Sequence, residues 1–338
     1  MESWELSSRK MSVNHGRVSF VFVPFLCLVL VLALTYQNCI EKAVTPADRS
    51  FVKRNEPLKL DHIGIAIKKN SSTLLIAQYA AGGSDTYAAL LNLTRPVNQA
   101  YAQMWGCDFL LVSGLWIQAE LEPNTTSVVP ESRATYNKVM LLHRVLTDPS
   151  YSHYDKLLIL DSDALIYDFS RDVASLLPAD RLFVAHKVNK SDTSSASNIN
   201  IGVTLWNLRH PSALPLARRW KRACLERILN SPGLRDSDQS PLHYILKNIP
   251  SAARERMVLA LPGELGYGGG TLIKHFMRPD ANNWTDLGMS SRVAKIQTAV
   301  NEICERTFPP TSLNFPAGWA FVQANVETSV EEIGRAHV

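Results

Sequence analysis

The sequence predicts an α/β domain with a mixed, mostly parallel sheet flanked by helices. Residues 156–160 (KLLIL) form a short, almost wholly apolar run, which is typical of a strand buried on both faces of such a sheet. Apolar runs of this kind alternate with stretches of helical spacing, the order expected for βαβ units. Two carboxylates, Asp161 and Asp163, follow the run directly. Because open α/β sheets bind ligands beyond the carboxyl ends of their strands, the fold class also predicts where the chemistry takes place.

The other elements are predicted from residue 72 onwards. Short apolar runs predict strands, and apolar residues recurring on one face predict helices. A helical segment leading to Trp105 is expected to break at Pro96, and the glycine-rich segment 263–270 is expected to be flexible because it fits no phosphate-binding spacing. The predicted strands are 72–80, 107–112, 156–160, 182–185, 201–206, 257–261 and 319–322, and the predicted helices are 132–146, 213–229 and a segment from Asp238 through Ile245.

A membrane anchor is expected ahead of this domain. Residues 18–36 carry no charge, and about 20 such residues form a helix long enough to cross a bilayer core. Basic residues precede the run, so the positive-inside rule places residues 1–17 in the cytoplasm and the rest of the chain on the other side. A cleaved signal peptide is the alternative, but the apolar run is longer than usual and no clear cleavage site follows it. Residues 37–58 are expected to be a stem and 59–325 the lumenal domain.

Glycosylation sequons agree with passage through the secretory pathway. Asn-x-Ser/Thr triplets begin at Asn70, Asn92, Asn124, Asn189 and Asn283. The cysteines outside the anchor match no zinc template, and an oxidising lumen would permit one or two disulfides of unassigned pairing. The last residues, 332–338 (EIGRAHV), match the translation of a common sequencing adapter and are treated as a non-native tail.

The acidic pair predicts a site for a hard divalent cation. Two carboxylates this close repel each other unless a cation lies between them. Their oxygens suit Mn²⁺ or Mg²⁺, ions that bind diphosphates. Acids after a strand also cap turns, but the buried strand before Asp161 favours the metal site. A haloacid dehalogenase phosphatase starts in the same way; its pattern has Thr or Val where this chain has Leu165, and that alternative stays open.

Three later segments also carry polar groups suited to a site. Asn200 and Gly202 lie at the start of an apolar run, where a glycine permits close approach of a ligand to the backbone. Asp238 and Gln239 open a helix, and the alternative for Asp238 is a first-turn acid and N-cap. His275 follows the short apolar run of TLIK.

Taken in order, these segments resemble the retaining nucleotide-sugar glycosyltransferases of the GT-A fold, a Rossmann-like architecture. The resemblance rests on four motifs, and through LDSDALI it extends from family eight (glycogenin-like and galactinol-synthase-like enzymes) to the galactosyl- and mannosyltransferases of family thirty-four. It covers roughly residues 73–279. The motifs are Asp161-Ser162-Asp163, Asn200-Ile201-Gly202-Val203, Asp238-Gln239 and His275-Phe276.

The resemblance implies a role for each of these residues. Asp161 and Asp163 would hold Mn²⁺, with Mg²⁺ as the alternative, and His275 would be the third metal ligand. Asp238 and Gln239 would lie beside the anomeric carbon as the catalytic pair. The residues implied to bind the donor are Asp161, Ser162, Asp163, Asn200, Gly202, Lys274 and Arg278.

One departure concerns the diphosphate contact. The family-eight pattern after the histidine runs toward Gly, Lys, Pro and Trp, whereas this chain has Met277, Arg278 and Pro279. Arg278 would substitute for the lysine, since an arginine keeps the charge and binds phosphate through two parallel hydrogen bonds. Lys274 or Lys138 would also reach the diphosphate.

The implied function is a type II membrane-anchored, Mn²⁺-dependent hexosyltransferase of the Golgi or endoplasmic reticulum. It would move a sugar from a UDP-sugar to a hydroxyl of a glycan, protein or small polyol, with retention. The net charge of +4, without a basic stripe, argues against a nucleic-acid partner, and no oligomeric state is assigned. We expect Asp163→Asn to lose activity and keep its fold. The alternatives from other classes are the phosphatase, with an aspartyl-phosphate on Asp161, and a catalytically silent carbohydrate-binding membrane protein.

Overall fold

The computed structural model describes the larger part of the domain expected after the stem. The predicted tail, anchor and stem, the strand 319–322, the segment 332–338, Arg278, Cys39 and the sequons at Asn70, Asn124, Asn189 and Asn283 lie outside the described residues. Among the described residues, no helix is long and apolar enough to span a bilayer. The described residues are 73–79, 85–112, 114–117, 131–187, 199–230, 238–261, 263–267, 269–277 and 286–307, all of them in the compact unit Ile63–Val338.

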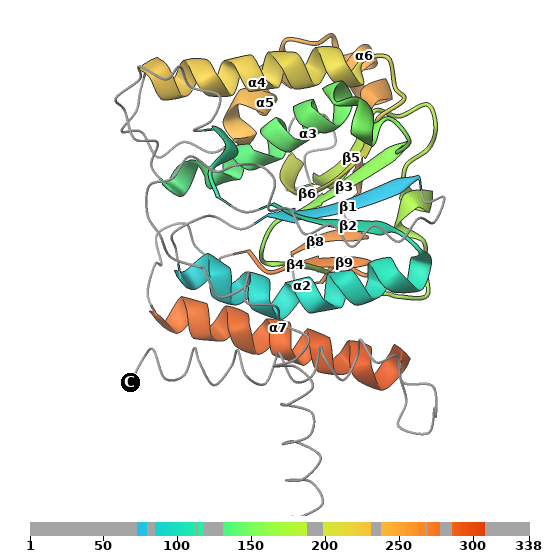
Figure 1. The fold of residues 1–338 in the computed structure, drawn as a ribbon, viewed down its shortest axis with the longest axis vertical. Helices are drawn as coiled ribbons and strands as arrows, with labels where there is room; N and C mark the ends of the chain where they lie inside the picture. Colours follow the sequence, from blue (N-terminus) through green and yellow to red (C-terminus); the bar gives the residue numbers. More distant parts are fainter. Residues whose placement is uncertain are drawn as a thin grey trace, which may run out of the picture. The chain divides into compact units, whose positions relative to one another are not determined.

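A six-stranded sheet forms the centre of the unit (Figure 1). β1 pairs in parallel with β2 and β3, and β5 pairs in parallel with β7, whereas β6 runs antiparallel to both β3 and β5. These pairings confirm the predicted mixed, mostly parallel sheet. In order across the sheet the strands are β2 (Asp108–Val112), β1 (Leu74–Tyr79), β3 (Lys156–Leu160), β6 (Ile199–Asn207), β5 (Phe183–Lys187) and β7 (Val258–Leu261).

A second, three-stranded sheet lies beside the end of β3. Its strands are β4 (Ala164–Ile166), β9 (Ile273–His275) and β8 (Leu265–Tyr267). β4 begins directly after Asp163 and runs antiparallel to β9, with Ala164 opposite His275. This register brings the end of β9 to the acidic pair, although more than a hundred residues separate them along the chain.

Helices cover both faces of the central sheet. Helices α3 (Asn137–Thr147), α4 (Ala213–Asn230) and α5 (Gln239–Lys247) pack on one face, and α2 (Asp85–Trp105) and α7 (Asp286–Thr307) lie on the other with the small sheet (Figure 1). The strands serve both cores by alternation: Leu157 and Ile159 of β3 belong to one, and Leu158 and Leu160 to the other. A short helix, α6 (Ser251–Met257), precedes β7.

Two local predictions are wrong. Pro96 does not break its helix, because α2 continues through it to Trp105. A proline deprives the carbonyl four residues earlier of its donor. Here that carbonyl belongs to the exposed Asn92, and Pro96 itself is buried together with Leu93 and Val97, which hold the helix in the core. The glycine-rich segment predicted to be flexible contributes β8. Helix α7 was not predicted.

Candidate metal centre

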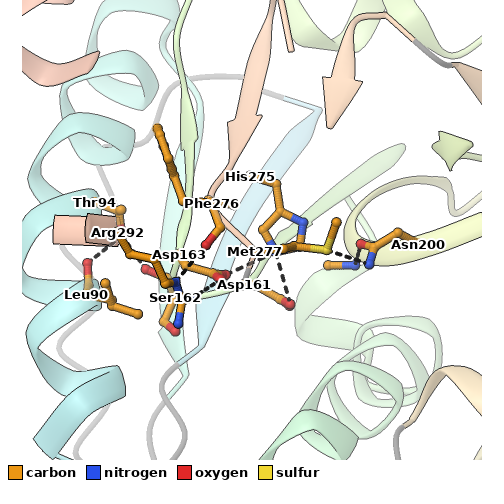
Figure 2. Close-up of polar contacts among 12 residues, drawn as sticks. Leu90, Thr94, Asp161, Ser162, Asp163, Asn200, His275, Phe276, Met277 and Arg292 are labelled. Carbon is orange, nitrogen blue, oxygen red and sulfur yellow. Dashed lines mark hydrogen bonds and ion pairs between the residues drawn. The ribbon is translucent and has the colours of Figure 1, made fainter. Parts of the chain in front are cut away.

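Three side chains converge where β3 and β9 end. Nε2 of His275 lies 3.0 Å from Oδ1 of Asp163 and 3.6 Å from Oδ2 of Asp161, and one ligand atom of each residue lies within 4.8 Å of the others (Figure 2). Neighbouring ligands of an octahedral ion with bonds of about 2.1 Å are about 3.0 Å apart. The two carboxylate oxygens and one imidazole nitrogen therefore lie close enough together, and have the chemistry, to hold a single small divalent cation.

Backbone pairing around the acids fixes this convergence. The amide of Asp161 donates to the carbonyl of Gly202 at 2.8 Å, which ties the first acid to β6. The amide of Phe276 donates to the carbonyl of Asp163 at 2.9 Å, which extends the β4–β9 pairing by one more bond. Each acid is thus held by a strand distant in sequence, and the imidazole enters from the second of these strands.

Gly202 leaves the space that two of the candidate metal ligands occupy. A Cβ added at this position would lie 2.1 Å from Cε1 of His275 and 2.6 Å from Oδ2 of Asp161. The sequence analysis expected this glycine to admit a ligand close to the backbone; the structure shows that it admits two of the candidate ligand side chains.

A buried lysine joins Asp161 to the predicted catalytic pair. Nζ of Lys138, on α3, lies 2.9 Å from Oδ1 of Asp161 and 3.1 Å from Oδ2 of Asp238. The hydroxyl of Tyr79 donates to the same Oδ1 of Asp161 at 2.5 Å. Asp238 makes no side-chain cap on α5, so its carboxylate serves this ion pair instead of the N-cap role considered above. Lys138, which was also considered for the diphosphate, thus forms ion pairs with these two acids.

Arg292 holds the second acid from the other side. This residue of α7 donates through its guanidinium to Oδ2 of Asp163 and, at 2.8 Å, through Nε to the carbonyl of Phe276 (Figure 2). The guanidinium and the carboxylate are both buried. Sequence reasoning missed Arg292 because it lies outside every motif; the only signal available was a charged residue beside the apolar positions of a helix that was itself not predicted.

The titration of these groups follows from burial and pairing. Burial opposes ionisation of Asp163, but the His275 ring and the Arg292 guanidinium outweigh it and lower the pKa of Asp163 to about 2. Burial also opposes protonation of His275, and the carboxylates of Asp163 and Asp161 outweigh it, so that its pKa is raised. At Asp238 burial prevails over the nearby Lys138 and raises the pKa. At neutral pH Asp163 is therefore a carboxylate, the form that binds a cation.

The side chains of Asn200 and Gln239, the remaining predicted residues of β6 and α5, bind backbone amides of β6. Oδ1 of Asn200 accepts from the amide of Gly202 at 2.8 Å, and its Nδ2 lies 2.9 Å from Sδ of Met277 (Figure 2). Oε1 of Gln239 accepts from the amide of Ile201 at 3.2 Å. Both side chains thus bind the backbone at the start of β6, next to Gly202.

Two predicted donor residues have other partners. Nζ of Lys274 lies 3.3 Å from Glu302 of α7 and 3.5 Å from the centre of the Tyr167 ring, so the structure does not bring Lys274 to the acids. Its neighbour in β9, His275, points to them because successive side chains of a strand alternate in direction. Ser162 is buried, and its carbonyl accepts from the hydroxyl of Thr94 at 2.7 Å.

A buried polar cluster supports the turn that carries the acids. The amide of Gln78 donates to the carbonyls of Asp161 and Ala164 at 3.1 and 3.3 Å. Asn98 donates to the carbonyl of Ala164 at 3.1 Å and accepts from the amide of Ile166 at 2.9 Å. Because buried backbone groups need such partners, these two amides and Thr94 fix the path of the chain from β3 to β4.

Comparisons with known proteins concern the fold. No protein-family model and no curated protein matches the chain. Among solved structures it is similar to a glycosyltransferase involved in the glycosylation of the major capsid of PBCV-1, with 15% identity over 67% of this chain and 98% of that one and a TM-score of 0.43. It is also similar to the glycosyltransferase GlyE of Streptococcus pneumoniae TIGR4, with 14% identity over 73% and 67% of the two chains and a TM-score of 0.39.

A third similar structure is the galactosyltransferase LgtC in complex with donor and acceptor sugar analogues. The identity is 17% over 73% of this chain and 99% of that one, and the TM-score is 0.35. All three are glycosyltransferases, the class that the sequence motifs resemble. Because the identities are this low, the function is argued from the side chains of the site and not from these structures.

Proposed function

We propose that this chain is a divalent-metal-dependent glycosyltransferase with a nucleotide-sugar donor. The observation that carries the proposal is the convergence of Asp161, Asp163 and His275 where β3 and β9 end, with the buried Asp238 joined to Asp161 through Lys138. A divalent cation held here would suit sugar transfer from a nucleotide donor, because it would offset the charge that develops on the departing diphosphate.

Asp161, Asp163 and His275 would hold the ion. Carboxylate oxygens suit Mg²⁺ and Mn²⁺ alike, and the imidazole nitrogen favours Mn²⁺. When bound, such an ion neutralises the negative charge that develops on a departing diphosphate. The positive charges of Lys138 and Arg292 lie against Asp161 and Asp163 and offset part of the repulsion between these carboxylates.

The donor sugar would lie against the start of β6 and the start of α5. Asn200 and Gly202 would contact the sugar from β6, and Asp238 and Gln239 would contact it from the start of α5. Because the Asp238 carboxylate is paired with Lys138 at 3.1 Å, we assign it to orientation of the site and not to nucleophilic attack. The acceptor hydroxyl would instead attack the anomeric carbon on the face that the diphosphate leaves, its proton passing to the diphosphate. This route retains the anomeric configuration.

Membrane anchoring is part of the proposal and rests on the sequence. The uncharged run 18–36, with basic residues before it and sequons after it, supports a type II orientation with the catalytic domain in the Golgi or endoplasmic reticulum lumen. The donor is proposed to be a UDP-sugar, and the acceptor a glycan, protein or small polyol.

A donor screen tests the proposed reaction. The full chain in detergent is incubated with a panel of UDP-sugars and Mn²⁺, and release of UDP, inorganic phosphate and free sugar is measured. We expect UDP release with a subset of donors, abolished by a chelator and restored by Mn²⁺. Release of inorganic phosphate would favour the phosphatase, and no release with any donor would favour a carbohydrate-binding protein. An inverted anomeric product would overturn retention and leave the transferase assignment standing.

A further inference from the structure

The two oxygens of each candidate metal-binding aspartate have different surroundings. Oδ1 of Asp161 accepts from Tyr79 at 2.5 Å and lies 2.9 Å from Nζ of Lys138, whereas Oδ2 faces Nε2 of His275 at 3.6 Å. One oxygen is therefore held by two donors, and the other faces the position between the three ligands.

Asp163 repeats this arrangement with different partners. Its Oδ1 faces Nε2 of His275 at 3.0 Å, and its Oδ2 is bound by the guanidinium of Arg292 (Figure 2). Asp163 is 6% exposed and Arg292 is 4% exposed, so water does not compete for this pair. Since Nε of Arg292 also donates to the carbonyl of Phe276, rotation of the guanidinium would break a second buried bond.

Helix α7 is itself fastened to the small sheet, which fixes the position of Arg292. The ring of Tyr167 lies between Nζ of Lys274, at 3.5 Å, and Cζ of Arg306, at 4.1 Å. The Tyr167 hydroxyl donates to Glu302 at 2.5 Å. Three residues of one helix, Arg292, Glu302 and Arg306, thus contact the segments that carry the metal ligands.

We infer that Arg292 is a specificity-determining residue for the metal: by occupying Oδ2 of Asp163 it leaves that aspartate only one oxygen to offer, as Tyr79 and Lys138 do for Asp161. Two one-oxygen carboxylates and one imidazole suit an ion that takes six ligands at short distance, as Mg²⁺ and Mn²⁺ do. Ca²⁺ takes more oxygens and often both of one carboxylate. It would have to break a buried, charge-assisted bond to obtain the second oxygen. The inference rests on the metal site of the proposed function.

A competition experiment without nucleotide or sugar tests this inference. Binding of Mn²⁺ and of Ca²⁺ to the full chain is measured by calorimetry for the natural protein and for Arg292→Gln, and the ratio of the two affinities is compared. Loss of a positive charge near the site raises the affinity for both divalent ions by a similar factor. The ratio of the two affinities therefore reports how many carboxylate oxygens Asp163 offers to each ion. We expect the preference for Mn²⁺ over Ca²⁺ to fall about tenfold, since Asp163 can then offer both oxygens.

Lys295→Gln is the matched control. It removes a positive charge from the exposed side of the same helix, three residues from Arg292, and we expect the natural ratio. If Arg292→Gln does not fold, Arg292→Lys decides the question, because an ammonium lacks the planar fork that binds Asp163 and Phe276 together. Arg292→Lys should also lower the preference for Mn²⁺ over Ca²⁺.

The outcomes separate this inference from the proposed function. An unchanged ratio in folded Arg292→Gln, or in Arg292→Lys where only that variant folds, overturns the role of Arg292. Failure of the natural protein to bind Mn²⁺ overturns the metal-dependent function, and the inference with it. A shifted ratio in a protein that transfers no sugar would support the inference and contradict the transferase.

Discussion

Gly202→Ala is expected to abolish metal-dependent sugar transfer while the protein stays folded. The added methyl would lie 2.1 Å from Cε1 of His275 and 2.6 Å from Oδ2 of Asp161, so at least one ligand must move. A displacement of about 1 Å in a catalytic group costs about 100-fold in rate, and we expect at least that loss. The measurements are the rate of UDP release at saturating Mn²⁺ and the affinity for Mn²⁺, both compared with the natural protein.

Gly263→Ala provides the matched control for this substitution. Gly263 has nothing within 4 Å of an added Cβ, so we expect natural activity and natural Mn²⁺ affinity. A fully active Gly202→Ala variant would contradict the placement of Asp161 and His275 around a shared ion. Loss of activity with unchanged Mn²⁺ affinity would move the role of Gly202 from the metal to the donor sugar.

Asp163→Asn is expected to lose activity by about a thousandfold and also to lose stability. The first effect follows from the loss of a charged metal ligand. The second adds to the expectation, drawn from sequence, that the variant keeps its fold: Asp163 is buried against Arg292, and removal of one partner from such a pair costs on the order of 3 kcal/mol. The measurements are UDP release with Mn²⁺ and the free energy of unfolding in urea.

Asp155→Asn is the control for the stability effect. Asp155 forms an ion pair with Arg209 at 2.7 Å, with both side chains about half exposed. Such surface pairs contribute less than about 1 kcal/mol, so we expect a small change in the free energy of unfolding and natural activity. Full Mn²⁺-dependent activity in Asp163→Asn would remove that residue from the metal site.

The parts of this site that lie close together in sequence could be predicted. The apolar run before Asp161 identifies β3, because a strand buried on both faces is almost wholly apolar. The acids at its end then follow from the rule for open sheets. His275 was assigned only through the family resemblance, since its approach depends on the pairing of β4 with β9 across more than a hundred residues.

The groups that complete the site could not be predicted, for a physical reason. Arg292 lies 129 residues from Asp163, and Gln78 lies 86 residues from Ala164, so no local pattern links them. A charged or amide side chain on a helix or strand ordinarily faces water. Only the packed structure shows that these ones face buried acids and carbonyls. Lys274 shows the converse: next to His275 in sequence, it points to α7 instead of the acids.

The most direct test is diffraction at the manganese edge from crystals grown with Mn²⁺ and UDP. A bound ion is predicted to give an anomalous peak about 2.1–2.3 Å from Oδ2 of Asp161, Oδ1 of Asp163 and Nε2 of His275, with the other carboxylate oxygens still bound to Lys138 and Arg292. A peak elsewhere, or none between these three atoms when UDP is bound, would contradict the account.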